Sequence, residues 1–199
     1  ANLHYGSGIL AGQTVDVTGH SLGGHLAMAF SRLFSSITNE VVAVNGAGFD
    51  FADSNVDSLF NQLEGLPGFP VGKITNVIGS AGMNLVSQDW LFLQQPAGRN
   101  EIFTESRDYD ETFGHGSSQM TDSLAVYNLL ASVGSNLSDA TSANLKVITD
   151  ILEASSNVAT NSLESAVNAL IGLFDRMIPP LVTDNLEDRE SLYQRIQAL

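Results

Sequence analysis

The chain has 199 residues, of which 43% are hydrophobic, so it is long enough to bury one sizeable core. Eight Lys and Arg face 22 Asp and Glu, and the formal net charge of −14 disfavours a site that follows nucleic-acid phosphates. The absence of cysteine excludes disulfides, a thiolate nucleophile and a Cys-ligated zinc site. We therefore expect one domain with a tail and no nucleic-acid partner.

The first predicted elements are a strand, a tight turn and a helix in immediate succession. Valines alternate with polar residues across residues 14–18, which indicates a strand. The turn Gly19-His20-Ser21-Leu22-Gly23-Gly24 follows directly. Apolar residues then recur at helical spacing up to Phe34, and we expect their stripe to face a sheet. The stripe consists of Leu22, Leu26, Phe30 and Leu33.

Two further apolar runs, residues 41–44 and 74–78, are short and bounded by turn residues. Such runs are typical of strands that are buried on both faces of a parallel sheet. A loop rich in Gly and Pro joins them, and residues 101–106 are a candidate last strand. The alternation of strands and helices predicts an α/β fold with a parallel sheet flanked by helices.

The sequence becomes helical from Asp122 onward, where Thr121 or Asp122 is placed to cap a helix. Its apolar stripe consists of Leu124, Tyr127, Leu130 and Ala131. Later stripes are Leu145, Ile148 and Leu152, then Leu163, Val167, Leu170, Phe174 and Met177 before Pro179-Pro180, and finally Leu192, Ile196 and Leu199. We interpret residues 136–199 as a helical extension that packs on the sheet or docks on another surface.

Gly19-His20-Ser21-Leu22-Gly23 fits the Gly-x-Ser-x-Gly pattern of a nucleophile elbow. In this turn, glycines stand where a side chain would collide with the neighbouring strand or helix. Ser21 would then lie at the helix N-terminus, where the helix dipole and the Leu22 N–H can stabilise an oxyanion. The pattern also occurs by chance in glycine-rich loops, but its position between an alternating strand and an amphipathic helix favours Ser21 as nucleophile.

A serine hydroxyl needs a base, and histidine is the side chain whose pKa suits that task near neutral pH. His115 lies after the candidate last strand and before a helix, where the chain order nucleophile, acid, base puts the histidine. His20 and His25 are expected to pack or to line a pocket wall, and His4 lies in the terminal segment. His115 is therefore the candidate base, and a solvated loop residue is the alternative.

The acid of a triad should lie between nucleophile and base, near the end of the strand at residues 74–78. Asp89 is the sole carboxylate in residues 80–93, and we take it as the candidate acid. Asp50, which follows the preceding strand, is the alternative. Asp108 and Asp110 are interpreted as part of a solvated face.

The run VTGHSLGGHLA resembles class 3-type lipases and related bacterial α/β-hydrolases. The run FGHGSSQMTDSLAVYNLLA is similar to the histidine segment of lipase-like regions in large secreted calcium-binding proteins. The resemblance covers residues 14–133, and it departs from the family at IGSAGMNLVSQD, which lacks an Asp directly after the strand. No glycine- and aspartate-rich nonapeptide repeat is present in the sequence, so calcium binding is not carried over.

The resemblance implies an α/β-hydrolase catalytic region over residues 1–135, without cofactor or metal. It implies hydrolysis of a carboxylic ester, such as a lipid ester, through an acyl-enzyme, and we expect contact with a lipid surface. The acidic, cysteine-free composition suits a secreted bacterial protein that is exported without disulfides, and a cytosolic protein is the alternative. Such folds place several strands before the nucleophile, so we expect N-terminal strands in a region that precedes this chain. Residues 63–71 and 90–93 are candidates for an acyl pocket or lid, or for ordinary core. The alternative function is an inactive hydrolase-fold scaffold or binding module of a larger secreted protein, and a related reaction on the same site is a further one.

Overall fold

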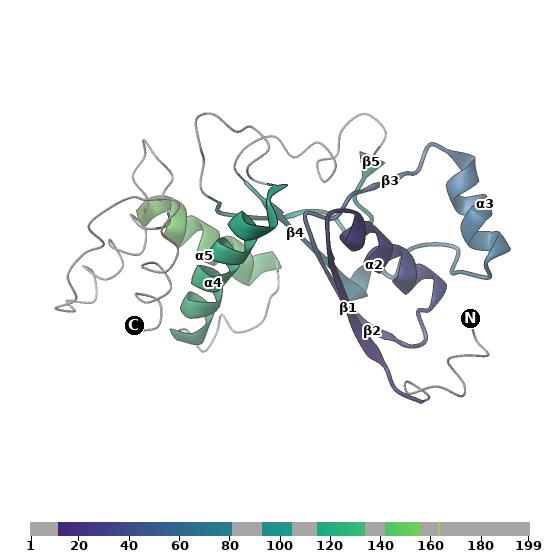
Figure 1. Cartoon of the computed structure of the whole chain (residues 1–199), viewed down its shortest axis with the longest axis horizontal. Helices are drawn as coiled ribbons and strands as arrows, with labels where there is room; N and C mark the ends of the chain where they lie inside the picture. The colour runs from purple at the N-terminus through teal and green to yellow at the C-terminus, as the bar shows by residue number, and fades with distance from the viewer. Residues whose placement is uncertain (1–11, 81–92, 105–114, 134–141, 156–162, 164–199) are drawn as a thin grey trace. The chain divides into compact units, whose positions relative to one another are not determined.

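The computed structural model of the chain describes residues 12–80, 93–104, 115–133, 142–155 and 163 (Figure 1). Strands and helices alternate over much of these residues, which confirms the expected α/β character. The chain divides into two compact units, which are described in turn. The first comprises Ala1–Ile78 and Asn84–Arg99, and the second Gly79–Met83 and Asn100–Leu199. The domain boundary expected between residues 135 and 136 lies outside the described residues.

The first unit is organised around parallel strands. Strands β1 (Val15–His20), β2 (Thr38–Val44) and β4 (Ile74–Gly79) lie side by side in this order. Val41 of β2 pairs with Val17 on one side and Ile74 on the other. Val41 is fully buried, as expected for a central strand that is covered on both faces. Both predicted apolar runs are therefore strands, and β2 begins three residues earlier than predicted.

Helix α2 (Leu22–Leu33) follows β1 and packs on β1 and β2, but not with the expected face. Leu22 and Leu26 are exposed, so the predicted stripe was wrong at these two positions. The face that is buried consists of Gly24, Ala27, Met28, Ser31 and Arg32. Small residues lie on this face because they let the helix backbone approach the strands closely. A hydrophobicity pattern selects the largest apolar side chains instead, which explains the error.

The loop predicted between the second and third strands contains regular structure. It includes β3 (Phe49–Asp50), α3 (Ser54–Gln62) and a 3-10 turn at Val71–Lys73, and β3 pairs antiparallel with β5 (Leu93–Gln94). The Asp53 carboxylate caps α3 by accepting a hydrogen bond from the Asn55 N–H at 2.9 Å. Phe60 is the buried residue of α3. The helix was not predicted because one buried side chain does not produce a periodic apolar stripe in the sequence.

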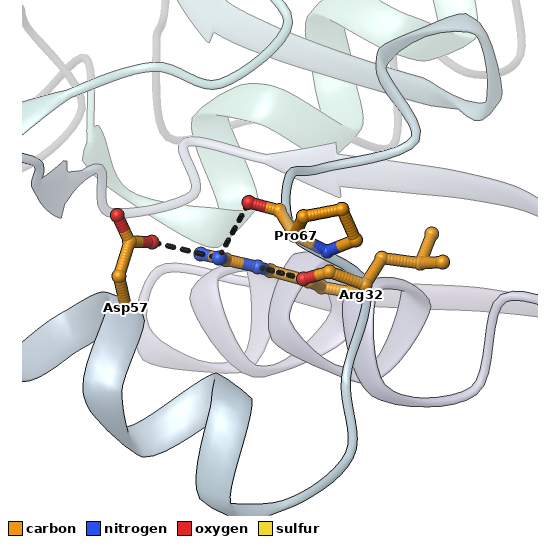
Figure 2. A network of polar contacts seen from close by, with 4 residues as sticks. Arg32, Asp57 and Pro67 are labelled. Carbon is orange, nitrogen blue, oxygen red and sulfur yellow. Dashed lines mark hydrogen bonds and ion pairs between the residues drawn. The ribbon is translucent and has the colours of Figure 1, made fainter.

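Arg32 ties α3 and the following loop to α2 (Figure 2). Its guanidinium is 1% exposed and donates to the Asp57 carboxylate at 2.7 Å and to the Leu66 and Pro67 carbonyl oxygens at 2.9 and 3.1 Å. The guanidinium carbon also lies 4.1 Å from the centroid of the Phe60 ring. These contacts offset the cost of burying the positive charge of Arg32, and they hold the loop that follows α3 in place.

The second unit contains β6 (Asn100–Ile102), α4 (Ser117–Val133) and α5 (Ser142–Ser155). Within this unit, the Ser80 N–H donates to the Ile102 carbonyl at 2.9 Å. The predicted strand at residues 101–106 is thus confirmed over two residues, and residues 105–106 lie outside the described ranges.

Helix α4 begins at Ser117, so Thr121 and Asp122 lie inside it and the predicted cap at these positions was wrong. The apolar stripe that suggested the cap starts later because residues 117–119 at the start of the helix are polar. Met120, which is 1% exposed, anchors this end of the helix in the unit. The helix was therefore predicted correctly, but its start was not, and of its predicted stripe only Tyr127 is fully buried.

A buried chain of hydroxyl groups joins α4 and α5 to β6. The Phe103 N–H donates to the Tyr127 hydroxyl oxygen at 2.7 Å, and the Tyr127 hydroxyl lies 2.6 Å from Thr149 Oγ1. The Thr149 hydroxyl in turn donates to the Glu101 carbonyl at 3.3 Å. Helix α5, with Ile148 and Leu152 buried, therefore packs on β6.

The later stripes of the predicted extension lie outside the described residues, with the exception of Leu163. That residue is fully buried. Within the described ranges, no helix combines the length and apolar character needed to cross a membrane.

Candidate functional site

Ser21 stands where β1 ends and α2 begins, with a backbone conformation of φ 56° and ψ −118°. Its N–H donates to the Val44 carbonyl at 3.0 Å, which continues the β1–β2 pairing. Its carbonyl accepts from the His25 N–H at 3.2 Å and from the Ala47 N–H at 3.3 Å. A non-glycine residue in a sparsely populated conformation of this kind costs about 1–3 kcal/mol, so its surroundings must hold it there.

Two glycines of the motif are required by close backbone contacts. A Cβ at Gly19 would lie 2.3 Å from the Gly23 carbonyl group, and a Cβ at Gly24 would lie 2.7 Å from the Gly46 Cα. A Cβ at Gly23, by contrast, meets no atom within 4 Å. Gly19 and Gly24 therefore make the tight turn possible, and the expectation that Gly23 also avoids a collision was wrong.

Leu22 is the first residue of α2 and the candidate oxyanion donor. The hydrogen bond from the His25 N–H to the Ser21 carbonyl is the first of the helical pattern, so the Leu22 and Gly23 N–H groups precede the intrahelical bonds. Such N–H groups, together with the helix dipole, favour a negative charge beside Ser21. The side chains of Leu22 and Leu26 are 65% and 58% exposed.

The segment after β2 is held against α2. Asn45 has a positive φ of 47°, and its N–H donates to the Val77 carbonyl at 2.8 Å. The Nδ1 atom of His25 lies 3.1 Å from the Gly48 carbonyl, which can only accept, so this nitrogen carries a hydrogen. The His25 ring also stacks on Phe49 with centroids 4.0 Å apart. His25 packs, as expected, and holds this segment in place.

A pair of buried amides lies behind the turn and was not identified from the sequence. Asn76 of β4 donates to the Gly46 carbonyl at 3.1 Å and to Gln95 Oε1 at 2.7 Å. Gln95 Nε2 donates to the same Gly46 carbonyl at 3.0 Å, and the Gly46 N–H donates to Asn76 Oδ1 at 3.1 Å. A lone Asn in an apolar strand is the one sequence signal that could have indicated this network.

His115, the candidate base, is half-buried and lies two residues before α4 begins. The first turn of that helix is closed by the Met120 N–H, which donates to the Gly116 carbonyl at 3.1 Å. His115 belongs to the second compact unit, and Ser21 belongs to the first. The role of His115 therefore remains a prediction.

Asp89, the candidate acid, lies outside the described residues. Asp50, the alternative, ends β3, and its Oδ1 atom accepts from the Ala52 N–H at 3.0 Å and from the Asp53 N–H at 3.2 Å. This oxygen organises the turn into α3, which is a local role. The acid therefore stays a prediction from the sequence.

The first candidate for an acyl pocket or lid, residues 63–71, leaves large apolar side chains in solvent. Leu63 and Val71 are each 55% exposed and Leu66 is 38% exposed. Phe69 instead packs on Phe49, with ring centroids 4.5 Å apart. Most of the second candidate, residues 90–93, lies outside the described residues.

Among the described residues, no group of three or more His, Asp and Glu side chains is placed to hold a metal ion. No protein-family model, curated protein or solved structure matches this chain. What supports a function is therefore the geometry around Ser21.

Proposed function

We propose that this chain is a serine hydrolase of the α/β-hydrolase type that cleaves carboxylic esters, lipid esters in particular. The main support is the backbone of Ser21, with φ 56° between a parallel strand and a helix. Strained conformations of this kind persist at sites where a function requires them, and this turn places a half-buried serine at a helix N-terminus.

The proposed reaction passes through an acyl-enzyme. The Ser21 hydroxyl oxygen attacks the ester carbonyl carbon while His115 takes its proton, and the oxyanion accepts a hydrogen bond from the Leu22 N–H. The tetrahedral intermediate then expels the alcohol, which receives the proton from His115. A water molecule repeats the attack and releases the acid. Asp89 is proposed to orient His115, with Asp50 as the alternative, and no cofactor is needed.

The preference for lipid esters has its support at the start of α2. Leu22 and Leu26 place exposed apolar side chains one and five residues after the nucleophile, where an acyl chain could be accommodated. The net charge of −14 favours a neutral lipid surface over an anionic one. Secretion from the cell belongs to the same proposal.

A second candidate is a hydrolase-fold scaffold or binding module without catalysis. The sequence directly after β4 favours it, because residues 80–88 contain no carboxylate to orient a histidine. The two candidates differ in the reactivity of Ser21, and this reactivity can be measured directly.

A fluorophosphonate probe on the full chain, followed by mapping of the labelled peptide, tests the proposal. We expect labelling at Ser21 that is lost in Ser21→Ala and in His115→Ala. Asp89→Asn should slow labelling by about 10²- to 10⁴-fold, and Asp50→Asn should leave it within a few fold. If Asp50→Asn slowed labelling and Asp89→Asn did not, the acid of the triad would be Asp50 instead of Asp89. A folded chain without labelling at Ser21 would refute the hydrolase and leave the scaffold.

A panel of p-nitrophenyl esters with acyl chains of increasing length tests the substrate class. We expect the kcat/KM to rise from acetate to longer chains, and Leu22→Ser or Leu26→Ser to reduce this preference with little effect on acetate. Equal kcat/KM values for all chain lengths would remove the lipid-ester part of the proposal.

A further inference from the structure

The segment that supports the Ser21 carbonyl is held by two side chains that no step of the proposed reaction uses. The Ala47 N–H donates to the Ser21 carbonyl, and Gly46 is the preceding residue. Both backbone polar groups of Gly46 are bonded to buried amides, its N–H to Asn76 and its carbonyl to Asn76 and Gln95. The position of Gly46 therefore determines where Ala47 meets Ser21.

Helix α2 also packs directly against Gly46. The Gly46 Cα is the atom that a Cβ on Gly24 would approach to 2.7 Å, and a Cβ on Gly46 would itself lie 3.2 Å from Met28 Cε. The start of α2 therefore cannot move toward this segment without displacing it. A shift of Gly46 would be transmitted to Ser21 through both the helix backbone and the Ala47 hydrogen bond.

The two amides are built into the unit rather than placed at its surface. Asn76 is 1% exposed and Gln95 is 9% exposed. Asn76 uses both its amide oxygen and its amide nitrogen toward Gly46, and its nitrogen also reaches Gln95 Oε1 at 2.7 Å. Buried polar networks of this kind rigidify a structure when their members are satisfied, and apolar residues would give more stability from simple burial.

We propose that Asn76 and Gln95 are positioning residues that hold the Ser21 turn in its strained conformation through Gly46. For catalysis, this inference rests on the proposed function. A displacement of about 1 Å at a reacting group can reduce a rate a hundredfold, so the pair would act on the chemical step more than on ligand binding.

Kinetics of fluorophosphonate labelling in the full chain separate these two effects. In Asn76→Leu, we expect the maximal labelling rate constant to fall about ten- to hundredfold, while the probe concentration for half-maximal rate changes by less than about twofold. Gln95→Met keeps the bonds between Asn76 and Gly46 and should show a smaller loss of the same kind. If Asn76→Leu fails to fold, Gln95→Met still tests whether the amide pair affects the labelling rate constant.

Thr38→Val is the matched control. Thr38 is 1% exposed, its hydroxyl donates to the Phe34 carbonyl at 2.9 Å, and it begins β2 at the opposite end from Gly46. We expect it to lose stability without changing the labelling rate constant by more than about twofold. Equal rate losses in Thr38→Val and Asn76→Leu, or no loss in Asn76→Leu, would overturn the positioning role and leave the proposed hydrolase intact.

Amide hydrogen exchange tests the same role without catalysis. The Ser21 and Ala47 amides bond to neither Asn76 nor Gln95 in the contacts described above, yet we expect both to exchange faster in Asn76→Leu than in Thr38→Val. The Val15 amide, at the other end of β1, is the internal reference. If the wild-type chain is not labelled, the proposed function fails, and the exchange rates alone test the positioning role of Asn76 and Gln95. Equal acceleration of exchange at the Ser21, Ala47 and Val15 amides would refute this positioning role.

Discussion

Gly24 of α2 lies directly against Gly46, so that a Cβ on Gly24 would stand 2.7 Å from the Gly46 Cα and 3.0 Å from the Gly19 carbonyl oxygen. Both neighbours are backbone atoms, which cannot rotate out of the way. Gly24→Ala should therefore lower the free energy of unfolding by about 1–3 kcal/mol and slow fluorophosphonate labelling. Gly23→Ala is the control, because its Cβ meets no atom within 4 Å.

Urea unfolding of both variants measures this difference. Gly23→Ala should leave the free energy of unfolding unchanged or raise it by up to about 1 kcal/mol, because alanine is the better helix former. A similar loss in both variants would show that the contact with Gly46 is not what makes Gly24 necessary.

Ser21→Gly should stabilise the chain while removing the nucleophile. Its φ of 56° is unfavourable for serine and allowed for glycine. We expect the free energy of unfolding to rise by about 1 kcal/mol and labelling to disappear. Thermal unfolding compared with Ser21→Ala is the measurement, because alanine removes the hydroxyl and keeps the strain. Equal melting temperatures for the two variants would contradict the strain.

Arg32 is expected to stabilise the first unit through its carbonyl contacts more than through its ion pair. Arg32→Met removes the donors to the Leu66 and Pro67 carbonyls and should cost about 2–4 kcal/mol. Asp57→Asn should cost less than about 1 kcal/mol, because the Asp57 side chain is 62% exposed. Urea unfolding at low and high salt compares the two, and a larger loss in Asp57→Asn would reverse this ranking.

Tyr127→Phe should destabilise the second unit by about 1–3 kcal/mol, because it leaves the Phe103 N–H without its acceptor in a buried place. Ser132→Ala in the same helix is the control, since the Ser132 hydroxyl is exposed and bonds one turn back to Leu129. Hydrogen exchange of the Phe103 amide locates the effect. Unchanged protection at Phe103 in Tyr127→Phe would show that this hydrogen bond contributes little.

Glu64→Gly should raise the free energy of unfolding by about 0.5–1 kcal/mol. Glu64 follows the last turn of α3 with a φ of 57°, which is the position and conformation that glycine prefers after a helix. Labelling at Ser21 should not change, because the substitution acts on the end of α3. A loss of stability on thermal unfolding would mean that the Glu64 side chain contributes more than its backbone costs.

The sequence by itself predicted the strand, turn and helix around Ser21, because local signals suffice there. Alternation predicts β1, the glycines predict the tight turn, and the backbone contacts of Gly19 and Gly24 show why no other residue fits. The existence of β2, β4 and the helix around Tyr127 followed from short apolar runs and periodicity in the same way.

Other features depended on residues that are far apart in the chain. Helix α3 is anchored by Phe60 and Arg32, and the face of α2 was set by its contact with Gly46, so periodicity of the local sequence predicted neither. The assignment of His115 and Asp89 was a prediction from chain order, and it stays one.

The local sequence thus determined which segments become strand, turn and helix, because hydrophobic spacing and glycine placement act within a few residues. Only the tertiary structure decided that Asn76 and Gln95 meet at Gly46, since β4 and the segment after β5 come together from different parts of the chain. Buried amides need partners, and their partners are chosen by strand order and register rather than by neighbours in sequence.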